Sequence, residues 1–306
     1  MKTYGVVGAL ISAIFFIVLS SCSGSGSSNT GTLSLNLSDA ALVDEANVTG
    51  VYITVTDIQY HAAGGGWQSM EEFNTSINPI NLLEWQEGQT ISLGDFQMPS
   101  GKYTQLRFML DATEEGTVPK SNPGCMIEFN GDNNETLYVP SGSQTGYKAI
   151  GNYEVPINGA VTMTADFDVR KSIVVSGDGS YYKLKPTIRL VVTDEAGTIS
   201  GNVTNMESNA SYVIYAYEYD ADGNTTWSVS ETDDPNPSDP ADVRFGNALN
   251  SNLVKEDGSY KLPFLAAGNY DLIIAKYDGN GDYITFYIHE GVVVESGETT
   301  LFDWVL

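Results

Sequence analysis

Apolar and polar residues alternate along most of the chain, and the pattern is clearest at residues 160–192. Every second residue at the start of this stretch is apolar: Val161, Met163, Ala165, Phe167 and Val169. The residues between them are polar or charged, and they include Asp166, Asp168 and Arg170. A period of two is typical of a strand with one buried face. Because the alternation resumes after Ser-Gly-Asp-Gly at residues 176–179, we predict one long hairpin.

Shorter alternating segments at residues 33–37, 47–60 and 102–111 predict further strands, and residues 126–139 predict another hairpin. Turn-forming Gly, Pro, Asn and Asp residues separate these segments. No segment keeps a helical period for long enough to form a stable helix. We therefore predict an all-β protein, and its 306 residues suit about two domains.

The charged residues of the 160–192 stretch predict ion pairs. Asp166, Asp168 and Arg170 are expected on one strand face, and Arg107 and Arg189 on neighbouring strands. Two Asp residues two positions apart point the same way, whereas a glycosidase needs two carboxyl groups that flank the bond it cleaves. The sequence also contains no nucleophile motif and no phosphate-binding Gly loop. We therefore expect no enzymatic activity.

The first residues predict a lipid anchor. Lys2 precedes an almost wholly apolar run at residues 6–19, which is shorter than the ~20 residues a membrane helix needs. Leu19-Ser20-Ser21-Cys22 follows, and it resembles a bacterial lipobox. Residues 1–21 are thus expected to be a lipoprotein signal peptide, with acyl chains on Cys22 that hold the protein on a membrane. Residues 22–31, rich in Ser and Gly, are expected to form a flexible tether.

The composition of the chain limits the partners, disulfides and metal sites that can be expected. The net charge of −25, with only 14 Lys and Arg residues, excludes nucleic acid as a partner. The chain has 2 Cys residues, so with Cys22 committed to lipid no intramolecular disulfide is expected. We expect Cys125 to be buried and inert. With 2 His residues and no Cys cluster, no zinc site of the usual spacing is expected either.

Five motifs in order indicate a family for the first domain. They lie at residues 31–40 (GTLSLNLSDA), 80–84 (INLLE), 101–107 (GKYTQLR), 140–146 (PSGSQTG) and 166–174 (DFDVRKSIV), the last followed by Leu-Lys-Pro at 184–186. Residues 32–193 resemble the DUF4382 family of bacterial envelope proteins. The resemblance implies a β-rich domain that is common on bacterial lipoproteins, and it implies no biochemical activity.

A second domain is predicted at residues 197–306. Residues 257–274 run from a strand through a Pro and Gly turn into a core strand, and residues 292–302 close the pattern. This domain resembles the carboxypeptidase-regulatory-like, or transthyretin-like, sandwich. The expected fold is therefore two β-sandwich domains, Ig-like or transthyretin-like. Residues 225–252 depart from the family as a longer polar insertion with three Pro residues, which we predict to be a loop.

The resemblance to sandwiches of this type implies a carbohydrate-binding-like fold, and sugars stack on exposed aromatic rings. The candidates are Tyr215, Tyr217, Tyr219 and Trp227. The three Tyr residues share a parity with Val213, so ordinary core packing is the favoured alternative for them. Trp227, which lies in the polar insertion, is the preferred sugar contact.

A calcium loop is the second candidate site. Asp220, Asp222, Asn224 and Glu231 fall at positions one, three, five and twelve of an EF-hand-like spacing. Thr225 occupies the position where such a loop needs Gly, and no helices flank it, so a hairpin turn is favoured.

The sequence as a whole predicts a non-catalytic, lipid-anchored protein of the bacterial cell envelope, on the outer membrane where the cell has one. Its expected role is that of a binding or scaffolding module, with glycan or envelope proteins as partners. The alternative is a calcium-stabilised structural or adhesive surface subunit.

Overall fold

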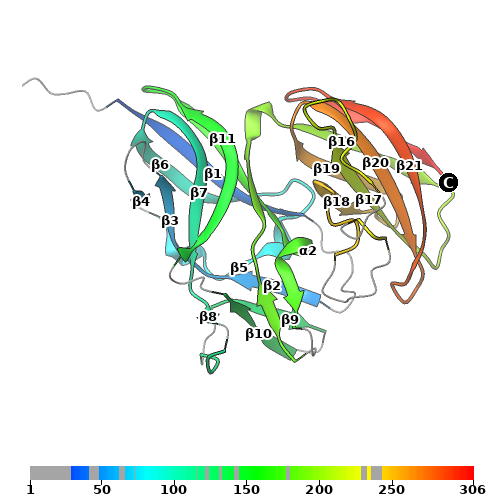
Figure 1. Ribbon diagram of the computed structural model, residues 1–306, viewed down its shortest axis with the longest axis horizontal. Helices are drawn as coiled ribbons and strands as arrows, with labels where there is room; N and C mark the ends of the chain where they lie inside the picture. Colours follow the sequence, from blue (N-terminus) through cyan, green and yellow to red (C-terminus); the bar gives the residue numbers. More distant parts are fainter. Residues whose placement is uncertain are drawn as a thin grey trace, which may run out of the picture.

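The computed structural model (Figure 1) describes residues 29–40, 48–61, 66–71, 73–114, 116–120, 124–130, 133–140, 145–176, 180–228, 233–235 and 243–306. The predicted signal peptide, Cys22 and Glu231 lie outside these residues. Within them, none of the helices combines the length and the apolar character needed to cross a membrane.

The prediction of an all-β protein is confirmed, because the described elements are strands joined by turns and a few short helices. An eight-stranded sheet has the order β4-β3-β7-β11-β15-β12-β1-β6. Its strands are β1 (Thr30–Ala40), β3 (Val55–His61), β4 (Trp67–Ser69), β6 (Ile91–Pro99), β7 (Gly101–Leu110), β11 (Tyr147–Val155), β12 (Ala160–Asp168) and β15 (Ile188–Val192).

A second sheet in the same half of the chain has the order β13-β14-β10-β9-β2-β5, with β8 beside β10. Its strands are β2 (Val48–Ile53), β5 (Ile80–Asn81), β8 (Thr113–Glu114), β9 (Met126–Phe129), β10 (Asn133–Val139), β13 (Ile173–Val175) and β14 (Tyr182–Leu184). The short helices are η1 (Thr75–Ile77), η2 (Leu82–Trp85), α2 (Val169–Ser172) and η3 (Thr193–Glu195). The strand predicted at residues 47–60 is thus two strands, β2 and β3, which belong to different sheets.

The long hairpin predicted at residues 160–192 is divided between these two sheets. Its outer halves pair as expected, because β12 and β15 are antiparallel neighbours. Its inner halves, β13 and β14, pair in the second sheet. The expected continuation of the strand to Arg170 is wrong: Asp168 caps the N-terminus of α2 by accepting a hydrogen bond from the Lys171 backbone, which ends the strand.

The second domain contains two four-stranded sheets, β19-β16-β22 with β23 beside β16, and β18-β17-β20-β21. Its strands are β16 (Gly197–Thr204), β17 (Ser211–Glu218), β18 (Asn250–Leu253), β19 (Ser259–Leu265), β20 (Gly268–Tyr277), β21 (Tyr283–Val294), β22 (Thr299–Leu301) and β23 (Trp304–Val305). Residues from both sheets, such as Ile199, Leu262, Ile214 and Leu272, form one buried cluster between them.

Residues 243–249 of the insertion pack on the outer face of the β18-β17-β20-β21 sheet. Phe245 and Ala248 are fully buried there against Val213, Tyr215 and Ile273. Both faces of β17 are therefore covered, one inside the sandwich and one by the insertion. The prediction of a polar loop missed this second hydrophobic cluster, because only three of the described insertion residues, Trp227, Phe245 and Ala248, contribute to it.

Candidate functional site

The two domains meet at α2, which lies on the side of the first domain that faces the second (Figure 1). The Asp168 carboxylate accepts the α2 cap bond and lies 3.3 Å from both the Arg170 guanidinium and the Lys171 ammonium. Burial alone would raise the pKa of Asp168, but the two adjacent cations and the backbone hydrogen bond lower it below its ordinary value. Asp168 is therefore a buried, ionised centre.

Arg170 extends from α2 to the backbone of the second domain. Its Nη1 donates to the backbone carbonyls of Arg244 and Phe245 at 2.9 Å, and its Nη2 donates to the carbonyl of Ala248 at 3.3 Å. The Lys171 ammonium donates to the same Ala248 carbonyl. The Arg170 side chain is only 2% exposed. The first domain thus fixes the backbone of the insertion with two cations.

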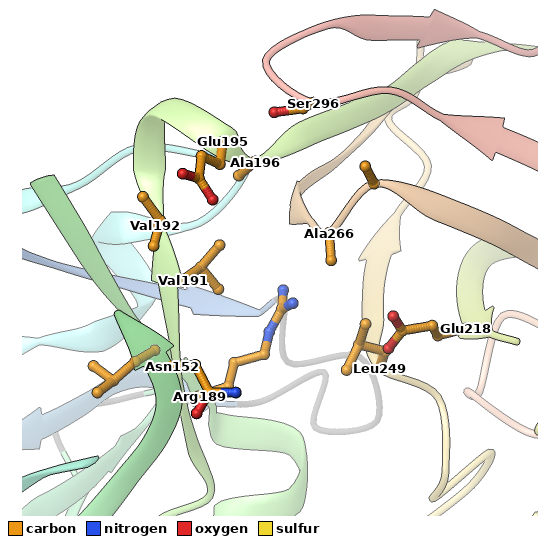
Figure 2. Close-up of a pocket in the computed structure, with 12 residues that line it drawn as sticks. Asn152, Arg189, Val191, Val192, Glu195, Ala196, Glu218, Leu249, Ala266 and Ser296 are labelled. Carbon is orange, nitrogen blue, oxygen red and sulfur yellow. The ribbon is translucent and has the colours of Figure 1, made fainter. Parts of the chain in front are cut away.

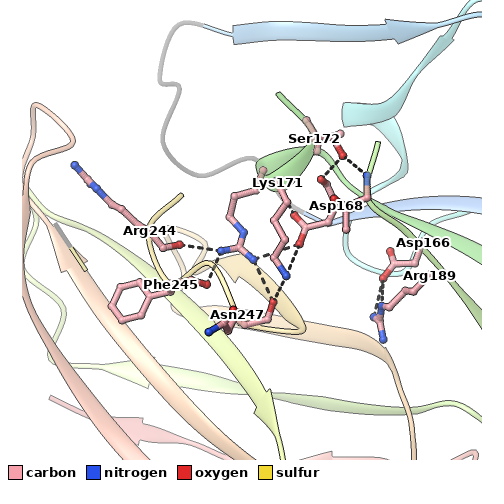
Figure 3. Close-up of polar contacts among 12 residues, drawn as sticks. Asp166, Asp168, Lys171, Ser172, Arg189, Arg244, Phe245 and Asn247 are labelled. Carbon is pink, nitrogen blue, oxygen red and sulfur yellow. Dashed lines mark hydrogen bonds and ion pairs between the residues drawn. The ribbon is translucent and has the colours of Figure 1, made fainter. Parts of the chain in front are cut away.

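A second ion pair lies beside the first (Figure 3). Arg189 on β15 donates from Nε to the Asp166 carboxylate at 2.8 Å, and its Nη1 donates to the Phe264 carbonyl of the second domain at 2.7 Å. Burial raises the pKa of Asp166 above its ordinary value even though Arg189 counteracts it. The pairing of Asp166 with Arg189 is the ion pair expected from the sequence.

Two other expectations about charges need correction. Arg107 does not pair with either Asp; it lies on β7, donates to the Gln59 side chain and covers the Trp67 ring at 4.4 Å. Arg170 does not share a strand face with Asp166 and Asp168, since it belongs to α2. The strand face that was expected to be polar is itself buried from Thr164 onward, because the second domain covers it.

Sequence reasoning missed Asp39, the third acid of this junction. Asp39 is 2% exposed, accepts a hydrogen bond from the Val169 backbone at 3.1 Å and accepts another from the Gln86 amide at 3.2 Å. Burial raises the pKa of Asp39 well above its ordinary value, with Asp166 and Asp168 adding repulsion. Only its position at the end of an apolar strand marks it in the sequence, and that is not a specific signal.

A further buried acid, Asp233, belongs to the insertion and ties two of its segments to β17. Its carboxylate accepts hydrogen bonds from the Tyr217 hydroxyl at 3.0 Å and from the backbone and side-chain nitrogens of Asn247 at 2.9 and 3.0 Å. Asn247 stands between Phe245 and Ala248, whose carbonyls receive Arg170. The insertion is therefore fixed by its own buried acid, by Tyr217 of β17 and by cations of the first domain.

A cleft of about 420 Å³ opens beside this network (Figure 2). One wall belongs to the first domain and η3, and includes Asn152, Arg189, Val192 and Glu195; the other includes Glu218, Leu249, Ala266 and Ser296. A second hollow of about 480 Å³ adjoins it and shares Asn152, Val192 and Glu195. Volumes of this order are typical of small-molecule sites between domains.

The expected aromatic platform is not present as predicted. Tyr215 and Tyr217 are 0% exposed and belong to the core under the insertion, so the alternative of core packing describes them. Tyr219 is half-buried and donates to Asp271 at 2.9 Å. Trp227 is half-buried, packs edge-on against Phe286, and its buried indole nitrogen has no hydrogen-bond partner in the described structure. Residues of the insertion bury the two Tyr rings, and the alternation within the strand gives no information about this contact.

The candidate calcium loop adopts the hairpin turn that was favoured from the sequence. Tyr219 and Thr225 form an antiparallel bridge. The Asp220 carboxylate accepts hydrogen bonds from the backbones of Asp222 and Asn224 at 2.9 Å, which lowers its pKa. Glu231 is outside the described residues. Nowhere in the described ranges do three or more His, Cys, Asp or Glu side chains gather as a metal site would require.

Cys125 is buried, as expected from the sequence. Its thiol is 0% exposed and lies 3.5 Å from the Asp111 carbonyl. Burial raises the pKa of the thiol to about 12, so the nucleophilic thiolate is scarce at neutral pH.

Comparison with known proteins gives one family match. The model of the family described as "Domain of unknown function (DUF4382)" matches residues 30–186. No curated protein matches the chain.

Among solved structures, the minor pilin GBS52 of Streptococcus agalactiae is 12% identical, with 89% of this chain and 94% of the pilin covered at a TM-score of 0.21. A putative cell adhesion protein from Bacteroides ovatus is 9% identical, with 89% and 91% covered at 0.22. The chain spans only 26% of a leucine-rich repeat protein from Bacteroides thetaiotaomicron, which is 12% identical, with 91% of this chain covered at 0.21. TM-scores this low do not show that these proteins share the overall arrangement of this chain.

Proposed function

This chain belongs to the DUF4382 family, and we propose that it is a non-catalytic, lipid-anchored envelope protein whose two domains act together as one glycan-binding unit. The observation that carries this proposal is the junction, where cations from a single segment of the DUF4382 domain hold the backbone of the second domain. Buried charges of this kind are costly to separate, so the domains keep a fixed relation and the cleft between them keeps its shape.

The proposal of a non-catalytic protein is supported by the structural roles of the reactive side chains in the first domain. Asp166 and Asp168 are occupied by Arg189, Arg170 and Lys171. The Cys125 thiol is buried and protonated. Each chemically active group that the sequence singled out in the first domain therefore has a structural role.

Anchoring is proposed through Cys22, since its context resembles a lipobox. Mass spectrometry of the protein purified from membranes is expected to find acyl chains on Cys22 and no residues before it. An unmodified Cys22 thiol would refute the anchor and leave the rest of the proposal standing.

Glycan is proposed as the ligand because the cleft combines apolar wall residues with side-chain hydrogen-bonding groups from both domains, the composition of sites that bind hydroxyl-rich ligands. The test is binding of the full chain, in detergent, to an array of polysaccharides and oligosaccharides. We expect binding that is reduced by Leu249→Arg, which fills the cleft with a long charged side chain. Trp227→Ala is the comparison that separates the cleft from the insertion surface, and it should leave binding unchanged. No binding to any sugar would refute glycan as the ligand.

A further inference from the structure

The cleft and its neighbouring hollow adjoin each other. Asn152, Val192 and Glu195 line both spaces, of about 420 and 480 Å³. The second hollow extends along β7 and β11 to Lys102 and Glu154. The two spaces together, called the junction groove below, have the volume to hold more than one sugar ring, and Arg189 of the junction lines the first of them.

The polar side chains of the first space are of two kinds. Arg189 forms an ion pair with Asp166 on one side and donates to the Phe264 carbonyl on the other, while its buried Nη2 makes no hydrogen bond in the described structure. Glu195 and Glu218, in contrast, make no side-chain hydrogen bond or ion pair with any described residue, and Figure 2 shows them on opposite walls of the cleft. The amide of Asn152 and the hydroxyl of Ser296 are likewise without partners in the described structure.

The side chains without partners indicate which chemical groups a ligand would have to supply. Carboxylates accept hydrogen bonds and attract positive charge, so the two Glu side chains need donors, preferably cationic ones. Since the positive charge of Arg189 is already used by Asp166, the free charge of the cleft is negative. The protein as a whole carries a net charge of −25, which repels anionic ligands over a distance.

The apolar lining of the cleft suits a ligand that also has an apolar face. Val192, Leu249 and Ala266 line it from both domains. Pyranose rings present a C–H face between their hydroxyl groups, and such a face packs on aliphatic side chains. A ligand that combines C–H faces, hydroxyl donors and positive charge is an amino sugar.

We propose that the junction groove binds an oligosaccharide that carries free amino groups, with Glu195 and Glu218 as the ammonium-binding residues. This inference rests on the proposed glycan function, and it adds the site and the charge of the ligand. Asn152 and Ser296 contact hydroxyl groups of the oligosaccharide, and Leu249 packs against the face of one sugar ring.

The test is calorimetric titration of the full chain in detergent with three oligomers of equal length. Their sugars are glucosamine, which is cationic, N-acetylglucosamine, which is neutral, and galacturonic acid, which is anionic. We expect the glucosamine oligomer to bind about tenfold or more tightly than the neutral one, because hydrogen bonds to charged groups are the stronger kind. The galacturonic acid oligomer should not bind, and added salt should weaken only the glucosamine complex.

Glu195→Gln and Glu218→Gln keep the shape of each side chain and remove its charge. Each is expected to abolish most of the preference for glucosamine over N-acetylglucosamine. Glu256→Gln is the matched control, since Glu256 is exposed and lines neither space. Equal affinity for the cationic and neutral oligomers, or an unchanged preference in both variants, would overturn the inference while glycan binding stands. Failure of all three oligomers and of the polysaccharide array would instead overturn the proposed function.

Discussion

The junction has an interior and a groove, and they use charge in opposite ways. In the interior, the buried Arg170 and Asp168 and the half-buried Lys171 pair with one another, and the two cations donate to carbonyls of the insertion. In the groove, Glu195 and Glu218 face the cleft without partners. Buried charges must be paired to be tolerated, whereas accessible unpaired charges are available to a ligand. Substitutions inside should therefore change stability, and those in the groove should change binding.

The largest effect is expected from Arg170→Met. The change leaves the Asp168 carboxylate with only Lys171 as its cation, removes the donor from the Arg244 and Phe245 carbonyls, and leaves the Ala248 carbonyl with Lys171 alone. Loss of one partner of a buried ion pair costs about 3–5 kcal/mol of unfolding free energy. Urea denaturation checks this value, and Glu218→Gln in the groove should leave the midpoint unchanged. Similar midpoints for the two variants would remove the distinction between interior and groove.

Phe245→Ala tests whether the insertion is part of the second-domain core. Phe245 is 0% exposed and stacks on Tyr215 at 4.4 Å between ring centroids. We expect a loss of about 3 kcal/mol in unfolding free energy from the cavity and the lost contacts. Tyr287→Ala is the control, since Tyr287 is 53% exposed. A neutral Phe245→Ala would mean that the insertion does not pack on the sheet in solution.

A smaller, pH-dependent effect is expected at Asp39. Its pKa in the folded protein is raised by burial, above the value of about 3.9 in an unfolded chain. The folded state therefore holds this proton over a range where the unfolded state has lost it. The stability contributed by Asp39 is fully present below about pH 3.9 and is lost as the pH rises through the raised pKa.

Asp39→Asn removes this dependence, because the amide stays neutral at every pH. Relative to the unsubstituted protein, the variant should gain stability as the pH rises above about 4. Asp166 and Asp168 remain in both proteins, so their contributions largely cancel in the difference. Denaturation midpoints measured from pH 4 to pH 8 check the prediction, and parallel curves for the two proteins would contradict it.

The smallest effect is expected from calcium. Asp220 Oδ1 accepts the backbone hydrogen bonds of its own turn, and in the described ranges no further two His, Cys, Asp or Glu side chains gather beside it as a metal site would require. Thermal unfolding with excess calcium and with chelator should give the same melting temperature. An increase with calcium would favour the alternative of a calcium-stabilised adhesive subunit, and Asp220→Asn would then show whether this turn is responsible.

Much of the framework was predictable because neighbouring residues decide it. The alternation at Leu33, Leu35 and Leu37 predicts β1, and all three are fully buried. The pairing of Asp166 with Arg189 followed from the expected hairpin, since the two residues oppose each other in its register. The end of β12 was not predictable from parity, because Asp168 closes the strand by a side-chain bond rather than by a break in the pattern.

The candidate site was less predictable. For Tyr215 and Tyr217 the sequence allowed a sugar platform and favoured core packing, and the insertion folded over them makes them core. Glu195 and Glu218 belong to no motif, and their importance comes from facing each other across the cleft (Figure 2). Sequence patterns describe one element at a time, so a site built between two domains leaves little trace in either.

The sequence by itself determined the all-β class, most strand positions and the segment that carries the junction charges, because strand periodicity and turn chemistry act between residues close in the chain. Only the tertiary structure decided which charges are buried, which Tyr rings are core and which carboxylates are left for a ligand. Burial depends on residues far apart in sequence: Arg170 meets Ala248, and Asp39 meets Val169, only when the sheets and the insertion have packed together.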